Sequence, residues 1–125
     1  MEGYEQWVAD IGLTQLAIDS YIFSNEHNVL EFKNNTYHKG RSKIHATGVF
    51  ASKNINKKEI IGLGSIDGIF RTTLGRYTNH SNNNNAMFYI LKNKDTIMIA
   101  EKDINKGEEI LVNYGDHTIR HEEYL

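Results

Sequence analysis

The sequence has 125 residues, a formal net charge of −2 and no cysteine. This length suits a single domain with a modest hydrophobic core. The nearly balanced charge argues against direct nucleic-acid binding, and the lack of cysteine excludes disulfides and cysteine-ligated zinc sites. No apolar run approaches the roughly 20 residues of a membrane-spanning helix, and the N-terminus lacks a signal-peptide pattern. We therefore expect a soluble intracellular protein that does not bind a membrane.

The N-terminal segment is predicted to be helical. Apolar residues recur at roughly helical spacing between Tyr4 and Ile22, with polar residues off that stripe. The simplest interpretation is a helical extension at residues 1–27 that covers one face of a sheet. The alternative is an element for homodimer formation or substrate docking.

From Asn28 onward the pattern changes to short β-rich runs separated by glycine, asparagine and lysine. Strands are predicted at residues 29–32, 37–38, 48–51, 60–63, 86–91, 96–100 and 110–112. Residues 93–95 link two of these strands like a hairpin loop. No alternation of strands with helices appears, so a doubly wound parallel sheet is not expected. The fold class is mostly β (α+β) with a helical N-terminus.

One short pattern occurs twice. Residues 51–59 and 100–108 both match A-x-K-[ND]-I-N-K-x-E. Each copy is predicted to run from a strand end through a polar turn into a second apolar strand. A single repeated pair is too little for a solenoid, so we expect two similar strand-turn-strand units within one domain.

A polar stretch, RYTNHSNNNNA at residues 76–86, lies between β-rich segments. Asparagine side chains compete with the backbone for its hydrogen bonds, so such a run is predicted to be a loop. Its first six residues carry an Asn-His-Ser motif, and Asn-Tyr-Gly follows later at residues 113–115. We expect the asparagines at residues 82–85 to be an ordinary surface turn.

Three stretches resemble the SET-domain protein methyltransferases. They are ATGVFA at residues 46–51, RYTNHS at residues 76–81 and INKGEEILVNYG at residues 104–115. The family patterns are G-x-G-[VF]-F-A, R-F-x-N-H-S-x-x-P-N and G-E-E-L-x-x-D-Y-G, in the same order. Each match alone is weak, but the ordered set, within residues 43–116, is specific.

The resemblance implies a SET-type fold of small curved sheets with a C-terminal pseudoknot. In that fold the C-terminal segment passes beneath a preceding loop, which brings the Asn-His-Ser and Asn-Tyr-Gly stretches together. Strand patterns alone do not predict such threading, because connections rarely thread loops. The expected division is a helical extension at residues 1–27, a SET-like catalytic domain at residues 28–116 and a tail at residues 117–125.

The resemblance also implies a cofactor, S-adenosylmethionine, and a set of site residues. Tyr114 would be the catalytic residue, with its hydroxyl orienting the methyl group and the substrate amine. A free lysine has a pKa of about 10.4, so a dry channel and the sulfonium charge would favour its neutral form. The expected cofactor-binding residues are Ala46, Thr47, Gly48, Val49, Arg76, Asn79, His80 and Tyr124.

The chain departs from the family pattern at several positions. Ala46 stands at a glycine position of the turn, and Asn113 stands at the usual aspartate position. The substrate-gripping helical insert and the zinc-binding post-SET segment are both missing. The chain is therefore most similar to the minimal SET proteins of viruses and bacteria, which would place it in the cytoplasm or in a host nucleus. If the turn needs a positive φ, Ala46 would be strained and cofactor affinity would fall.

The expected function is a protein-lysine N-methyltransferase that acts on a lysine-bearing basic protein or peptide. The alternative is a non-catalytic, degenerate SET fold that binds the cofactor or a basic peptide. An acidic C-terminal third suits a basic partner, although such a charge run is commonly just a solvated face. His117 and His121 would share one helical face of the tail, but no third ligand is evident and we expect no metal. Tyr124 or His121 would fold over the adenine.

Overall fold

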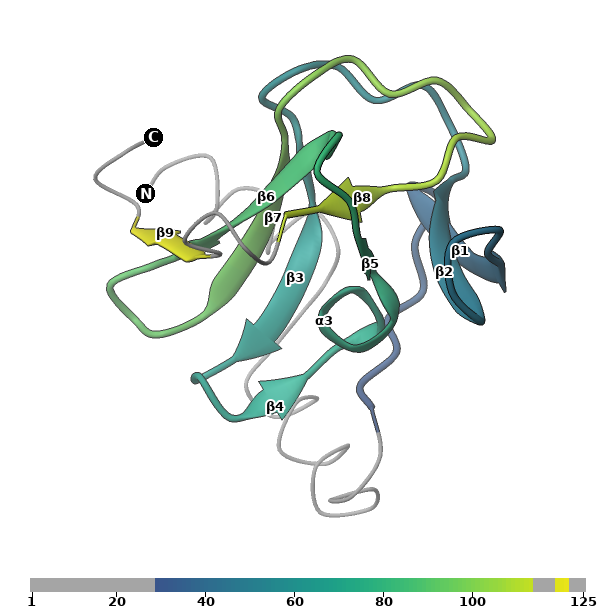
Figure 1. The fold of residues 1–125 in the computed structure, drawn as a ribbon. Coiled ribbons are helices and arrows are strands. Elements are labelled where there is room, and N and C mark those ends of the chain that lie inside the picture. The colour runs from purple at the N-terminus through teal and green to yellow at the C-terminus, as the bar shows by residue number, and fades with distance from the viewer. Residues whose placement is uncertain (1–28, 114–118, 122–125) are drawn as a thin grey trace.

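The structure is a computed structural model, which describes residues 29–113 and the backbone of residues 119–121 (Figure 1). The predicted N-terminal helix, Tyr114, His117 and Tyr124 lie outside these ranges. The described residues form three sheets and one short helix, α3 (Thr73–Tyr77). The strands are β1 (Tyr37–Arg41), β2 (Thr47–Ala51), β3 (Ile60–Ile66), β4 (Phe70–Arg71), β5 (Asn79–His80), β6 (Ala86–Ile90), β7 (Thr96–Ala100), β8 (Leu111–Val112) and β9 (Ile119–His121).

The largest sheet has five strands in the order β4-β3-β7-β6-β9. Its pairs are antiparallel except for β6 with β9, which is parallel. Every residue of β7 is buried. Ile97 and Ile99 belong to one hydrophobic cluster, whereas Met98 and Ala100 belong to another. Because successive side chains of a strand point to opposite faces, this sheet has apolar packing on both sides, which explains the uninterrupted apolar run in the sequence.

The short helix α3 packs closely against β3. Thr72 is its N-cap and accepts a hydrogen bond from the backbone N–H of Gly75 at 3.3 Å. A Cβ at Gly75 would collide with the carbonyl oxygen of Gly64 in β3, so only glycine allows this close approach. The packing fixes the point from which the chain leaves α3 and enters β5.

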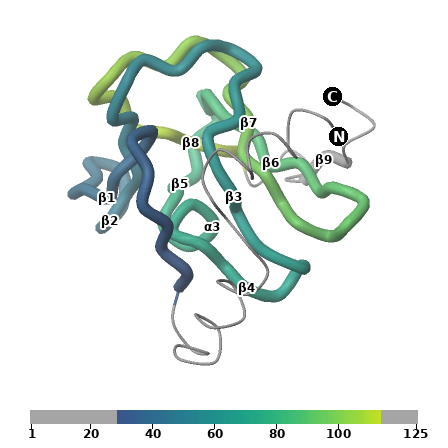
Figure 2. The backbone as a smooth tube through the Cα atoms, turned by 180° about the vertical axis from the view of Figure 1, so that it is seen from behind, coloured from purple at the N-terminus to yellow at the C-terminus, as the bar shows by residue number. Residues whose placement is uncertain are grey.

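The two copies of the repeated pattern contact each other at one end of the domain (Figures 1 and 2). At the centre, Ile55 and Ile104 exchange backbone hydrogen bonds of 2.7 and 2.8 Å. Both isoleucines are buried. The predicted strand-turn-strand units are therefore confirmed, and they form a paired arrangement.

Hydrogen bonds around these isoleucines also occur in matching pairs. The N–H of Lys57 donates to the side chain of Asp103 at 2.8 Å, and the N–H of Lys106 donates to the side chain of Asn54 at 2.8 Å. The two positions correspond in the repeat. This approximate two-fold pairing joins the turn between β2 and β3 to the turn between β7 and β8.

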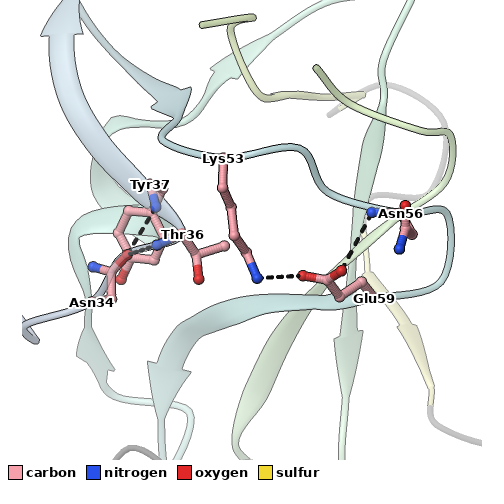
Figure 3. A network of polar contacts seen from close by, with 6 residues as sticks. All are labelled: Asn34, Thr36, Tyr37, Lys53, Asn56 and Glu59. Carbon is pink, nitrogen blue, oxygen red and sulfur yellow. Dashed lines mark hydrogen bonds and ion pairs between the residues drawn. The ribbon is translucent and has the colours of Figure 1, made fainter. Parts of the chain in front are cut away.

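Within the first copy, Glu59 closes the turn on itself (Figure 3). Its carboxylate accepts a hydrogen bond from the N–H of Asn56 at 3.4 Å and forms an ion pair with Lys53 at 3.1 Å. In the second copy, Glu108 accepts the equivalent bond from the N–H of Asn105 at 2.9 Å. The two copies share the same spacing of asparagine and glutamate because in each copy the glutamate accepts a hydrogen bond from the N–H of the asparagine three residues earlier.

The predicted strands are largely confirmed, with some corrections. The hairpin at residues 93–95 joins β6 to β7, and β7 has the predicted bounds. The strand predicted at residues 29–32 is wrong, since only Leu30 forms an isolated bridge, with Thr72. Part of the predicted loop at residues 76–86 is regular structure, because it contains the end of α3 and all of β5. A helical tail is also wrong for His121, which lies in strand β9.

The repeat offers a test of backbone strain with an internal control. Lys58 has φ 75° and its repeat mate Gly107 has φ 91°. A lysine in this left-handed region is strained, so Lys58→Gly should raise the free energy of unfolding by about 0.5–1 kcal/mol in urea titrations. The matched control is Lys57→Gly, at a neighbouring exposed position without a positive φ, which should lower it by a similar amount. Equal destabilisation by both changes would contradict the strain.

Candidate functional site

The centre of the candidate site is the parallel pairing of β5 with β8 (Figure 1). Asn79 lies opposite Leu111, and His80 lies opposite Val112. The pairing continues where the N–H of Ser81 donates to the carbonyl of Val112 at 2.9 Å. The Asn-His-Ser motif therefore lies beside the segment that leads into Asn-Tyr-Gly, which is the contact that the expected pseudoknot requires.

Asn85 holds β8 in this position. Its side chain donates to the carbonyl of Glu109 at 2.9 Å and accepts from the N–H of Leu111 at 2.8 Å. Its own N–H donates to the carbonyl of Leu111 at 3.0 Å. The expectation that residues 82–85 are only a surface turn is thus wrong for Asn85, because its side-chain amide forms hydrogen bonds with the backbone of β8 and of the residues just before it. The signal was present, because Asn85 matches the final asparagine of the R-F-x-N-H-S-x-x-P-N pattern.

The turn between β1 and β2 is closed by Ser42. Its N–H donates to the carbonyl of Ala46 at 2.8 Å, and its hydroxyl oxygen accepts from the N–H groups of Ile44 and His45 at 2.9 and 3.2 Å. Ala46 has φ 41°, within the left-handed region. The alanine that replaces the family's glycine therefore occupies a conformation that favours glycine.

Asn79 connects this turn to β5. Its side-chain Nδ2 donates to the carbonyls of His45 and Thr47 at 2.9 and 3.3 Å and to the carboxylate of Glu109 at 3.1 Å. Three acceptors around one nitrogen fix the orientation of the amide, because a flipped amide would set its oxygen against other oxygens. Within the described part of the chain no donor reaches Oδ1 of Asn79.

Glu109 is a member of this site that the sequence did not single out. The hydroxyl of Ser42 lies 2.9 Å from both oxygens of its carboxylate. Gly48 provides the space, since a Cβ there would collide with that carboxylate. In the sequence Glu109 was one of several acidic residues near the C-terminus, and only the tertiary structure separates it from them.

The other predicted cofactor-binding residues are more dispersed. Val49 is fully buried in the core, at 0% exposure, so its side chain offers no exposed surface to a ligand. Arg76 is exposed at the end of α3, with its guanidinium 5.5 Å from the ring centroid of Tyr77. His80 is half-buried on β5. The structure thus brings together the turn at residues 46–48 and Asn79, whereas Tyr114 and Tyr124 lie outside the described residues.

The shifted pKa values in the described ranges lie away from this site. Burial raises the pKa of Tyr37 to about 12, and the nearby carboxylate of Glu31 adds to the shift. A hydrogen bond to Glu31 raises the pKa of the exposed Lys39. In the same ranges no cluster of three His, Asp or Glu side chains is placed to hold a metal ion. No described helix is long and apolar enough to cross a bilayer.

Comparison with known proteins finds a matching family model and solved structures of similar fold. The family model of the SET domain matches residues 64–115. The crystal structure of a putative histone methyltransferase from Plasmodium falciparum is similar, with 26% identity and a TM-score of 0.59, over 67% of this chain and 96% of that chain. Among curated proteins, none matches significantly.

Two structures of polycomb repressive complex 2 from Chaetomium thermophilum share the fold. One, bound to S-adenosylmethionine in an autoinhibited conformation, has 20% identity and a TM-score of 0.54. The other, a humanized mutant bound to the inhibitor GSK343, has 23% identity and a TM-score of 0.54. In each case the alignment covers 69% of this chain but only 16% of the other chain, so at this level of identity the likeness supports the fold alone.

The strained turn at Ala46 makes a direct prediction. Ala46→Gly should raise the free energy of unfolding by about 0.5–1 kcal/mol, because glycine adopts a positive φ without a steric cost. Thr47→Gly is the control, since Thr47 is exposed in β2 and its φ is not positive. That change should destabilise the protein. Thermal and urea unfolding of the two variants measure the difference, and a loss of stability in Ala46→Gly would contradict the strain.

Proposed function

We propose that this chain, which contains a SET domain, is a protein-lysine N-methyltransferase that uses S-adenosylmethionine. The observation that carries the proposal is the meeting of the turn at residues 46–48 with Asn79 beside the β5–β8 pairing. Sequence motifs that lie far apart in the chain become parts of one site. The resemblance assigns a cofactor-binding role to these same residues.

The described residues fit the methionine end of such a cofactor. An α-ammonium group needs hydrogen-bond acceptors, and Oδ1 of Asn79 is an acceptor without a donor among the described residues. Gly48 leaves room for the Glu109 carboxylate that accepts from Asn79, because it has no Cβ. When bound, S-adenosylmethionine would supply a methyl group carried on a positively charged sulfur.

The proposed role of the protein is to align and desolvate the reacting groups. A substrate lysine would have to lose a proton before its nitrogen could accept the methyl group, and a site that aligns it and excludes water would favour that loss. Tyr114, which follows directly after Asn113, would orient the amine and methyl group through its hydroxyl. The short β5–β8 pairing would hold Asn79 and the approach to Tyr114 in register.

The proposed substrate is a lysine-bearing basic protein or peptide. Glu101, Asp103 and Glu108 contribute negative charge in the described C-terminal third, and the latter two are exposed. Exposed Lys102 and Lys106 alternate with these carboxylates and offset two of the three charges, so the basic substrate is proposed mainly from the family resemblance. The similar Plasmodium structure is that of a putative histone methyltransferase, so a histone-like tail is the first substrate to try. A homodimer through the N-terminal segment remains a prediction.

A non-catalytic binding module is the second candidate, because Ala46 has a positive φ at a glycine position. Incubation with S-adenosylmethionine labelled on its methyl group and a mixture of basic proteins separates the two candidates. Transfer of label to lysine supports the enzyme. Binding of the cofactor by calorimetry without any transfer supports the binding module.

Asn79→Ala should weaken the binding of S-adenosylhomocysteine by roughly tenfold or more, because it removes both the acceptor and the hydrogen bonds that hold the turn. Isothermal calorimetry measures this effect. Asn82→Ala, at an exposed position of the same loop, is the matched control and should bind as the unmodified protein does. Equal affinity in both variants would exclude Asn79 from the site.

Tyr114→Phe should retain cofactor binding and lose most methyl transfer, since only the hydroxyl is removed. The expected loss in kcat is on the order of 10²-fold, as for other single positioning or acid–base groups. Tyr124→Phe is the control, because a stacking ring would persist in that variant. Full activity of Tyr114→Phe would refute the catalytic role, and a parallel loss of cofactor affinity would indicate a binding role instead.

A further inference from the structure

We propose that Glu109 is a positioning residue that assembles the cofactor site from its two separate parts. Its carboxylate joins the turn at residues 42–47 to Asn79, and it is one of the three acceptors that orient the Asn79 amide toward the cofactor. This inference rests on the proposed function, because it assigns Glu109 a role in binding S-adenosylmethionine. Glu109 itself need not touch the cofactor.

The carboxylate lies where three distant segments of the chain meet. Ser42 donates its hydroxyl hydrogen to this group, with 2.9 Å to each oxygen. Asn79 donates from Nδ2 to Oε2 at 3.1 Å. The side chain of Glu109, a residue of the third motif, thus links the turn next to the first motif to Asn79 in the second motif.

The backbone around Glu109 holds the carboxylate in place. On one side the N–H of Ala51 donates to the carbonyl of Glu108 at 2.9 Å, and on the other the N–H of Ile110 donates to the carbonyl of Val49 at 2.8 Å. The carbonyl of Glu109 itself accepts from the side chain of Asn85 at 2.9 Å. A side chain on so restrained a backbone is suited to positioning others, because little freedom is left to lose.

The link through Ser42 extends to the turn itself. The hydroxyl that donates to Glu109 also accepts from the N–H groups of Ile44 and His45. A charged acceptor strengthens the polarisation of such a chain of hydrogen bonds. Without the carboxylate, the hydroxyl hydrogen could rotate elsewhere and the turn would be held less firmly.

The link through Asn79 concerns chemistry at the site. A carboxylate only accepts hydrogen bonds, so it accommodates Nδ2 of Asn79 but not Oδ1. A glutamine at position 109 could donate as well as accept, so it would oppose a flipped amide less, and only the carbonyls of His45 and Thr47 would then favour Nδ2 on that side. Loss of the charge would therefore weaken the hold on the Asn79 amide, whose Oδ1 we expect to receive the cofactor's ammonium group.

Glu108 is the neighbouring glutamate and provides a matched control. It is exposed, and its carboxylate accepts from the N–H of Asn105 at 2.9 Å within its own turn. Glu108→Gln and Glu109→Gln therefore make the same chemical change in adjacent residues of one chain. The two variants have equal net charge, so long-range electrostatics cannot separate them.

The experiment compares both variants with the unmodified protein in two measurements. Calorimetry with S-adenosylhomocysteine should show about tenfold weaker binding for Glu109→Gln and less than about twofold change for Glu108→Gln. Amide hydrogen exchange in the cofactor-free protein should be faster at Ile44 and His45 in Glu109→Gln alone. In an Asn79→Ala background, Glu109→Gln should weaken binding by less than it does alone, because the two residues act as a unit.

Each outcome decides the inference. Weaker binding with faster exchange in Glu109→Gln, and neither in Glu108→Gln, supports it. Unchanged binding in Glu109→Gln overturns the inference while the proposed function stands. If the unmodified protein binds no S-adenosylhomocysteine, the proposed function fails and this role fails with it. If Glu109→Gln unfolds, Ser42→Ala tests the same link, and unchanged affinity in that variant overturns the inference.

Discussion

The parallel pairing of β5 with β8 is the contact on which the candidate site depends. Each strand has only two residues, too few to be stable alone. Their register is imposed from outside, by the side-chain amide of Asn85 and by the buried Ile110 and Val112. A site assembled in this way requires the folded core, because neither strand would form without it. Local propensity contributes little to where Asn79 lies.

The paired repeats form a frame that determines where the third motif begins. Hydrogen bonds between the two copies connect the β2–β3 turn to the segment that precedes β8. The paired repeats place the side chain of Glu108 at the surface and that of Glu109 within the site, although the two residues are adjacent in the chain. Alternation along an extended backbone is sufficient to separate a solvated carboxylate from a structural one. The two glutamates therefore differ in environment because adjacent side chains of an extended segment point to opposite sides.

The site combines a strained backbone at Ala46 with a group of hydrogen bonds to the Glu109 carboxylate, here called the clamp. Ala46 adopts a positive φ, which is an unfavourable backbone conformation for alanine. Ser42 and Asn79, which contact the same turn, both donate hydrogen bonds to the charged carboxylate of Glu109. Strain in a backbone persists where surrounding contacts determine the conformation more strongly than the residue does. The clamp offers a physical reason why the turn tolerates alanine at this position. It also makes the shape of the site sensitive to a residue that does not belong to the turn.

The sequence by itself determined the mostly β class, the β7 strand, the hairpin at residues 93–95 and the two repeat units, because these depend on local apolar patterns and turn residues. Three ordered motifs also indicated a resemblance to the SET-domain family, whose family model matches residues 64–115. The sequence misplaced a strand at residues 29–32 and missed α3, β4, β5 and β9, which are short and owe their conformation to neighbours. It also dismissed Asn85 as a surface turn and left Glu109 within a charge run. Only the tertiary structure decided these roles, since a hydrogen bond between residues 42 and 109 joins positions that no local pattern relates.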